Sequence, residues 1–135
     1  MRGIFIDTSG FYALEDMSDQ NHPAAKVYWG EIAKKKIPLF TTNYIFDETY
    51  TLLRISLGYK KAIRFGESIK ESSVAQVIQV DEEIQEEAWK IVKNYDDKDF
   101  SFTDCTSFVV MKNMGLEVAF SFDKHFKTYG FLRQP

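Results

Sequence analysis

The sequence predicts an α/β protein whose parallel sheet is covered by helices on both faces. Short apolar runs recur along the chain, and between them lie amphipathic stretches that are each long enough for two helices. Strands that alternate with helices in this way pair in parallel, because each helical crossover returns the chain to the end of the sheet where the previous strand began. The length of 135 residues and the hydrophobic share of 44% suit a single domain spanning residues 1–135.

The first strand-and-helix unit begins close to the amino end of the chain. Residues 3–6 form an apolar run that is typical of a short buried strand. Thr8 and Ser9 have side-chain oxygens that can cap a brief helix over residues 11–14. After a polar loop, apolar and aromatic side chains recur at helical spacing over residues 24–36, so a longer helix is predicted there.

The second unit repeats this order of one strand and two helices. A short strand is predicted over residues 38–40, and Thr41 and Thr42 follow as candidate caps for the next helix. Apolar side chains at helical spacing predict that helix over residues 44–57. A second amphipathic helix is predicted over residues 60–70, after a glycine that ends the first.

The third unit contains an acidic helix. The apolar side chains within residues 74–80 suit a third strand. Asp81 then caps a helix that runs to about residue 95, and its acidic first turns form a solvated face near the positive end of the helix dipole. We interpret Asp97 and Asp99, in the charged loop that follows, as turn formers rather than as metal ligands.

The last unit completes the predicted sheet. Thr103 is the candidate cap of a helix over residues 104–113, and a glycine ends that helix. A fourth strand is predicted over residues 117–120, and a short fifth strand near residues 131–132. The sheet is therefore predicted to contain four to five parallel strands.

Four acidic residues stand where apolar runs end or inside helices that follow them. Asp7 and Asp123 follow predicted strands, and Asp104 opens a predicted helix. Glu48 lies about two turns into another helix and has the longer reach. Because the carboxyl ends of parallel strands converge on one cleft, these carboxylates predict a site for Mg²⁺ or Mn²⁺. The alternative is that they act singly, as helix caps, turn residues or solvated side chains.

The sequences around these acids resemble motifs of the PIN-domain nucleases. In chain order, the matching stretches are IFIDTSGFYAL at residues 4–14, TTNYIFDE at residues 41–48, SFTDCTS at residues 101–107 and FSFDKHF at residues 120–126. The resemblance covers nearly the whole chain. It is closest to the small VapC-like members, which are toxins of type II toxin–antitoxin pairs.

The resemblance implies a three-layer α/β/α sandwich and a Mg²⁺- or Mn²⁺-dependent ribonuclease that hydrolyses RNA phosphodiester bonds. It implies that Asp7, Glu48, Asp104 and Asp123 are both the metal ligands and the catalytic residues. The partners it implies are an RNA substrate, a small antitoxin protein that blocks the cleft, and a second copy of the chain in a homodimer. The groove between the helices predicted over residues 44–57 and 60–70 is a candidate docking surface for the antitoxin.

Three alternatives remain open. Adjacent helical positions point about 100° apart, so only one of Asp47 and Glu48 can face the cleft, and Asp47 is the fallback. A catalytically silent module that binds RNA or protein is a second functional hypothesis, and metal-dependent turnover distinguishes it from the nuclease. A phosphoryl-transfer enzyme with Asp7 as its nucleophile is a third, but the haloacid-dehalogenase-like pattern requires a second Asp where this chain has Ser9.

Composition narrows the setting of the protein. Setting aside the four candidate acids leaves 16 acidic against 17 basic side chains, so the net charge of −3 does not exclude a nucleic-acid substrate. A single cysteine, Cys105, cannot form an intramolecular disulfide. No apolar segment approaches the roughly 20 residues of a membrane span. We therefore expect a cytoplasmic protein without membrane association.

The remaining polar residues give weaker signals. His125 follows Asp123 by two positions, and we interpret it as a partly exposed loop histidine rather than as a phosphate contact. His22 is interpreted as structural, and two isolated histidines with one cysteine do not make a zinc motif. Lys124 and Lys127 flank Asp123 and are candidates for contacts with the RNA backbone.

Overall fold

The computed structural model describes residues 3–71 and 74–135. Its elements follow one another in the order β1 (Ile4–Ile6), α1 (Thr8–Glu15), α2 (His22–Lys35), β2 (Leu39–Thr42), α3 (Asn43–Ser56), α4 (Tyr59–Lys70), β3 (Gln76–Ile78), α5 (Glu82–Asn94), α6 (Phe102–Met114), β4 (Val118–Phe120), α7 (Lys124–Tyr129) and β5 (Leu132–Gln134). Among the described residues, no helix is long and apolar enough to cross a membrane.

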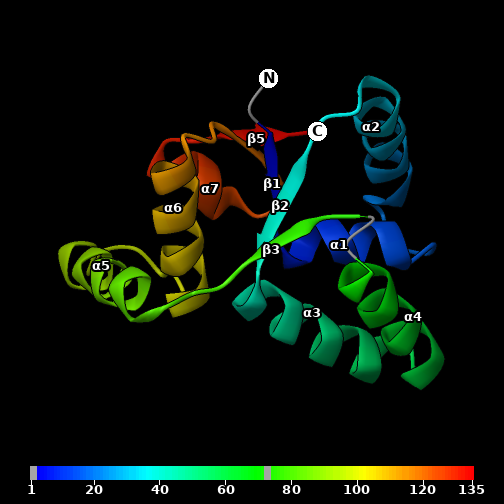
Figure 1. The fold of residues 1–135 in the computed structure, drawn as a ribbon, viewed down its shortest axis with the longest axis horizontal. Coiled ribbons are helices and arrows are strands. Elements are labelled where there is room, and N and C mark those ends of the chain that lie inside the picture. The colour runs from blue at the N-terminus through cyan, green and yellow to red at the C-terminus, as the bar shows by residue number, and fades with distance from the viewer. Residues whose placement is uncertain (1–2, 72–73) are drawn as a thin grey trace.

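Five parallel strands form the central sheet, in the order β3-β2-β1-β4-β5. Helices α5, α6 and α7 lie on one side of β1 and β2, and α1, α2 and α4 lie on the other (Figure 1). The predicted α/β/α sandwich with a parallel sheet is therefore confirmed. Ile6 of β1 is opposite Phe120 of β4, so Asp7 and Ser121 both leave the sheet at its carboxyl edge.

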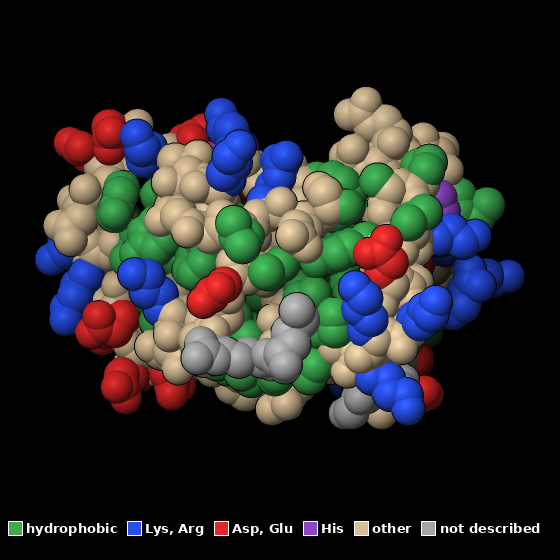
Figure 2. Space-filling model, turned by 90° about the horizontal axis from the view of Figure 1, so that it is seen from above, with side chains coloured by type: hydrophobic (Ala, Val, Ile, Leu, Met, Phe, Trp, Pro, Cys, Tyr) green, Lys and Arg blue, Asp and Glu red, His purple; other side chains and the backbone are tan. Residues whose placement is uncertain are grey.

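The opposite edge of the sheet shows a mixed surface. Figure 2 views the molecule from the side of the strands' amino ends, where Lys and Arg side chains stand in separate groups around the rim. Acidic and hydrophobic side chains lie between these groups. Among the described residues, the basic side chains visible on this face do not gather into one patch.

Two predicted helix caps were wrong, and in both cases the true cap lies just upstream. Helix α1 begins at Thr8, and its cap is Asp7, whose side chain accepts a hydrogen bond from the Gly10 amide. Helix α6 begins at Phe102 and is capped by Ser101 in a capping box, so Thr103 lies inside the first turn. A carboxylate or hydroxyl one or two positions earlier satisfies the same free N–H groups, and sequence spacing does not separate these choices.

Other caps follow the prediction more closely. Thr42 caps α3 by accepting from the Ile45 amide, whereas Thr41 is a strand residue of β2. Asp81 caps α5, as predicted, by accepting from the Ile84 amide. Helix α7 was not predicted, because it has only six residues and is too short for a helical period to stand out.

An aromatic cluster joins α6 to α7. Phe108 is fully buried, and its ring stacks on Tyr129 with centroids 4.3 Å apart. The rings of Phe100 and Phe126 meet Phe108 edge-on at 5.1 Å and 5.3 Å. Because α6 carries Asp104 and α7 follows Asp123, this packing fixes the relative position of two of the predicted site acids.

A glycine allows α1 to approach β4 closely. A Cβ atom added at Gly10 would lie 2.6 Å from the backbone oxygen of Phe120 and 3.0 Å from the side chain of Ile6. Both neighbours belong to the sheet core and cannot move aside cheaply. The absence of a side chain here therefore brings the start of α1 against the carboxyl end of β4.

We expect Gly10→Ala to lower the free energy of unfolding by about 1–3 kcal/mol, because the added methyl overpacks this contact. The measurement is urea unfolding followed by circular dichroism. Gly30→Ala is the matched control: no atom lies within 4 Å of its added Cβ, and alanine favours an exposed helix by up to about 1 kcal/mol. Equal stability of Gly10→Ala and the natural protein would contradict the close approach.

Candidate metal centre

One cavity at the carboxyl edge of the sheet brings the four predicted acids together. Its volume is about 450 Å³, and Asp7, Glu48, Asp104 and Asp123 all line it. They come from the ends of β1 and β4 and from helices α3 and α6. Elements separated by most of the chain thus place four carboxylates around one space, as expected for strand ends that converge.

Asp7 is the most buried of these acids, with 5% of its surface exposed. Its Oδ1 accepts hydrogen bonds from the Ser9 hydroxyl at 2.8 Å and the Gly10 amide at 3.0 Å, and its Oδ2 accepts from the Ser121 hydroxyl at 2.8 Å. Burial raises the pKa of Asp7 to about 6, and the charge of Asp123 adds to this, although the three hydrogen bonds oppose it. A bound cation would relieve this conflict by stabilising the ionised form.

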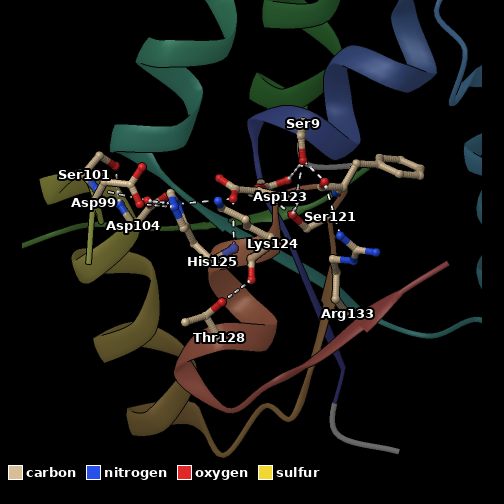
Figure 3. Close-up of polar contacts among 12 residues, drawn as sticks. Ser9, Asp99, Ser101, Asp104, Ser121, Asp123, Lys124, His125, Thr128 and Arg133 are labelled. Atoms are coloured by element: carbon tan, nitrogen blue, oxygen red, sulfur yellow. Dashed lines mark hydrogen bonds and ion pairs between the residues drawn. The ribbon is translucent and has the colours of Figure 1, made fainter. Parts of the chain in front are cut away.

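Two serines hold Asp7 against the chain that follows β4. The hydroxyl oxygens of Ser9 and Ser121 are 3.2 Å apart. The Phe122 amide donates to Ser9 Oγ at 2.8 Å, and the Asp123 amide donates to Ser121 Oγ at 2.9 Å (Figure 3). The orientation of Asp7 and the start of the Asp123 turn are therefore set by the same hydrogen-bond network.

Glu48, and not Asp47, lines the cavity. Glu48 Oε1 accepts a hydrogen bond from the Thr8 hydroxyl. Thr8 Oγ1 in turn accepts from the hydroxyl of Thr49, at 3.0 Å. This chain of contacts links α3 to the first turn of α1, and it points the side chain of Glu48 toward the other acids.

Asp104 is held by the first turn of α6. Its Oδ2 accepts from the Ser101 amide at 3.0 Å, as the return contact of the capping box. Burial raises the pKa of Asp104 above its ordinary value, and the charge of Asp123 acts in the same direction. The hydrogen bond from Ser101 and the contact with His125 lower this pKa and limit the rise.

His125 is a site residue that the sequence interpretation missed. It is the second residue of α7, not a loop residue, and its side chain is only 15% exposed. Its Nδ1 lies 2.9 Å from Asp104 Oδ2 and 3.2 Å from Asp123 Oδ1. Its Nε2 lies 3.0 Å from Asp99 Oδ1 (Figure 3). The imidazole therefore sits among three carboxylates.

The charges around His125 change its proton affinity. Burial lowers the pKa of His125. The charges of Asp123 and Asp104 raise it, as do the hydrogen bonds to Asp99 and Asp104, and the net result is a pKa above the ordinary value. Asp99 was interpreted as a turn former, and the structure places it on the cavity wall as well. The signal in the sequence was the spacing of His125 two residues after Asp123, inside a short helix that was not predicted.

The donor set at this position fits a divalent cation. Ligand atoms of Asp104, Asp123 and His125 all lie within 4.8 Å of one another. In the described part of the chain, no other group of three histidine, cysteine or acidic side chains meets this spacing. Carboxylate oxygens suit Mg²⁺ and Mn²⁺, and imidazole nitrogen suits the later transition metals. Without a cation, the four carboxylates that line the cavity repel one another.

Comparisons with known proteins find a matching family model and similar sequences. The PIN domain family model matches residues 4–132. The chain is 36% identical over 129 residues to the 23S rRNA-specific endonuclease VapC20 of Mycobacterium tuberculosis, covering 96% of this chain and 95% of that protein. It is 37% identical over 132 residues to a VapC ribonuclease of Archaeoglobus fulgidus, covering 92% of this chain and 75% of that protein.

A solved structure shows the same arrangement of the chain. The crystal structure of Mycobacterium tuberculosis VapC20, described as a sarcin–ricin loop cleaving toxin, matches with a TM-score of 0.88 at 35% identity. The match covers 98% of this chain and 100% of that chain. The fold is thus similar to that of a toxin nuclease along almost the entire length.

Proposed function

This chain belongs to the PIN-domain family, and we propose that it is a divalent-metal-dependent endoribonuclease of the VapC type, the toxin of a toxin–antitoxin pair. The observation that carries the proposal is the cavity at the carboxyl edge of the sheet, which gathers Asp7, Glu48, Asp104 and Asp123. The two relatives of this chain described above are named as an endonuclease and a ribonuclease. A complete set of four acids in one cavity favours catalysis over a silent binding role.

The four acids would hold one or two Mg²⁺ or Mn²⁺ ions. A bound cation would polarise a phosphoryl oxygen and lower the pKa of the attacking water. Asp7 and Asp104 are held by hydrogen bonds from the chain itself, so their carboxylates are oriented before a cation arrives. Such fixed carboxylate oxygens would suit a hard divalent cation such as Mg²⁺ or Mn²⁺.

Glu48 differs from the other three acids in its exposure. It reaches the cavity from α3 and remains exposed to solvent. We assign it to accept the proton of the water that attacks phosphorus in line. As the new bond to phosphorus forms, the bond to the 3′ oxygen breaks, and that oxygen takes up a proton from solvent. The products are a 5′-phosphate and a 3′-hydroxyl.

Basic side chains stand close to the cavity. Lys124 follows Asp123 directly, and Arg133 Nη1 donates to the backbone oxygen of Phe122 at 3.4 Å. Both are exposed, and they provide charges for phosphates on either side of the cut. Because the similar VapC20 protein is named for 23S rRNA, we propose structured ribosomal RNA as the first substrate to test.

The antitoxin would dock on α3 and α4. A hollow of about 280 Å³ lies between them, lined mainly by apolar side chains that include Phe46, Tyr50 and Ile63. Such a surface fits the apolar face of a partner helix. The homodimer and the cytoplasmic location remain predictions.

The decisive experiment is cleavage of ribosomal RNA by the purified protein in EDTA, Mg²⁺ or Mn²⁺, with mapping of the cut ends. We expect cuts only with a divalent cation. The cleavage rate should fall at least about a hundredfold in Asp104→Asn, because the site loses a negative charge that binds the cation. The amide oxygen that this substitution introduces can still accept the Ser101 hydrogen bond, so the helix cap is kept. Asp97→Asn is the matched control, since Asp97 is an exposed acid paired with Lys98 away from the cavity.

Two outcomes would refute the proposal. Cleavage that persists in EDTA at the same rate would show that no cation is needed. Equal cleavage by Asp104→Asn and Asp97→Asn, at matched purity, would show that the cavity is not where the reaction occurs.

A further inference from the structure

We propose that His125 is a direct metal ligand of this centre, and that its nitrogen makes the centre prefer Mn²⁺ to Mg²⁺. The inference rests on the proposed function, because it concerns the same cation. It adds an imidazole to the four acids and assigns Asp99 as the residue that orients it. Two features carry it: the positions of the two imidazole nitrogens and the contacts that hold the ring.

The first nitrogen stands where a ligand would stand. In octahedral coordination with bonds of about 2.1 Å, neighbouring ligand atoms are about 3.0 Å apart. Nδ1 of His125 lies 2.9 Å from Asp104 Oδ2 and 3.2 Å from Asp123 Oδ1. These spacings are also those of hydrogen bonds from Nδ1, and the ligand atoms of all three residues lie within 4.8 Å of one another. A cation that replaced the Nδ1 proton would therefore find three ligand atoms close together.

The second nitrogen is held as in known metal sites. A histidine that binds a metal through one nitrogen almost always donates its other N–H to a carboxylate, a carbonyl or a water. Nε2 of His125 lies 3.0 Å from Asp99 Oδ1. Without a cation, both ring nitrogens lie close enough to carboxylate oxygens to donate to them. When a cation displaces the Nδ1 proton, the Nε2–H contact with Asp99 can persist and keep the Nδ1 lone pair directed toward the cation.

The imidazole is also fixed by packing. The ring of Phe100 meets it edge-on, with centroids 5.3 Å apart and planes at 82°. Phe100 belongs to the aromatic cluster around Phe108, so the histidine is tied to the core between α6 and α7. This packing restricts the orientations that the imidazole can adopt.

A nitrogen ligand changes which cation is favoured. Mg²⁺ is a hard cation that takes oxygen ligands and gives up its waters reluctantly. Transition metals bind mixed nitrogen and oxygen sites with an affinity that rises along the first row from Mn²⁺. Replacing one oxygen by imidazole should therefore shift the centre toward Mn²⁺ and away from Mg²⁺.

The test is pulsed electron paramagnetic resonance of Mn²⁺ bound to the full chain, with Mn²⁺ and Mg²⁺ dissociation constants from titration. We expect a nitrogen hyperfine coupling from a directly bound imidazole in the natural protein and its loss in His125→Asn and His125→Gln. Mn²⁺ affinity should fall about tenfold in these variants, while Mg²⁺ affinity changes by less than about threefold.

The matched control is His22→Gln. His22 is the chain's other histidine, and its Nδ1 contacts the backbone oxygen of Ala13 at 2.7 Å, outside the acid cluster. The nitrogen coupling should persist in this variant. Circular dichroism on each variant confirms that the fold is kept.

The outcomes separate this inference from the proposed function. If Mn²⁺ binds and Asp104→Asn weakens it, but no nitrogen coupling is seen, the metal site stands and His125 is not a ligand. Tighter Mn²⁺ binding in His125→Asn would also overturn the inference, because it would show that the imidazole competes with the cation. If Mn²⁺ does not bind, or binds equally to the natural protein, Asp7→Asn and Asp104→Asn, both the inference and the proposed metal site fail.

Discussion

Asp7→Asn should reduce RNA cleavage by at least about a thousandfold while the protein stays folded. Asp7 is the best-positioned acid of the cavity, with three hydrogen bonds holding its two oxygens. An amide keeps nearly the same shape but cannot supply the negative charge that binds a cation, and charge stabilisation of this kind is worth several kcal/mol. The measurement is single-turnover cleavage with saturating Mg²⁺ or Mn²⁺.

The same substitution should stabilise the cation-free protein at neutral pH. The pKa of Asp7 is about 6 in the fold, above its ordinary value of 3.8. The neutral acid therefore contributes stability that is fully present below about pH 4 and is lost as the pH rises through about 6. A shift of this size corresponds to roughly 3 kcal/mol at most. In EDTA, the Tm advantage of Asp7→Asn should grow from pH 4 to pH 6 and then level off.

Adding Mn²⁺ should reverse this order. The natural protein should gain in Tm because a cation binds the folded state, and the variant should gain much less. A variant that cleaves RNA at the natural rate would sink the assignment of Asp7. A variant that is less stable than the natural protein at pH 7 in EDTA would show that burial of the Asp7 charge has no cost.

Phe108→Ala should produce the largest loss of stability, about 3–5 kcal/mol. Phe108 is fully buried and contacts the rings of Phe100, Phe126 and Tyr129 at 4.3–5.3 Å. Removing its ring leaves a cavity between α6 and α7 that these neighbours cannot fill without moving. Urea unfolding in EDTA measures the loss directly.

The control for this prediction is Tyr59→Ala. Tyr59 is 59% exposed and has a cation–π contact with Arg54, so its truncation should cost less than about 1 kcal/mol. Under conditions in which Phe108→Ala stays folded, this variant should also bind Mn²⁺ more weakly, because Asp104 and Asp123 lose the aromatic packing that fixes α6 against α7. A loss below about 1 kcal/mol in Phe108→Ala would mean that the cluster does not fix α6 to α7.

Most of the fold could be predicted from the sequence. The strands predicted over residues 3–6 and 117–120 correspond to β1 (Ile4–Ile6) and β4 (Val118–Phe120), because a short buried apolar run between helices is typical of a strand. Their parallel pairing follows from the crossovers, which admit essentially one hand. The meeting of Asp7 and Asp123 at one edge follows in turn, since both come just after neighbouring parallel strands.

Local details of the site were harder to predict. The sequence favours Thr8 or Ser9 as the cap of α1 and Thr103 as the cap of α6, whereas the caps in the structure are Asp7 and Ser101. Asp7 is a cap only in the alternative interpretation of the four acids. Several side chains in such a stretch can satisfy the same amide groups, with energy differences of about 1 kcal/mol. The choice between Asp47 and Glu48 depended in the same way on the rotation of α3, which is set by its packing and by the contact between Thr8 and Glu48.

The sequence by itself therefore determined the parallel α/β architecture and the four acids at its carboxyl edge, because hydrophobic period and chain chirality are local properties. Only the tertiary structure decided that His125 lies between Asp104 and Asp99, residues 21 and 26 positions away. The raised pKa of Asp7 likewise follows only from the tertiary structure, which buries its carboxylate. Both depend on how α6 and α7 pack and on how deeply a carboxylate is buried, and these quantities exist only when distant segments of the chain are in contact.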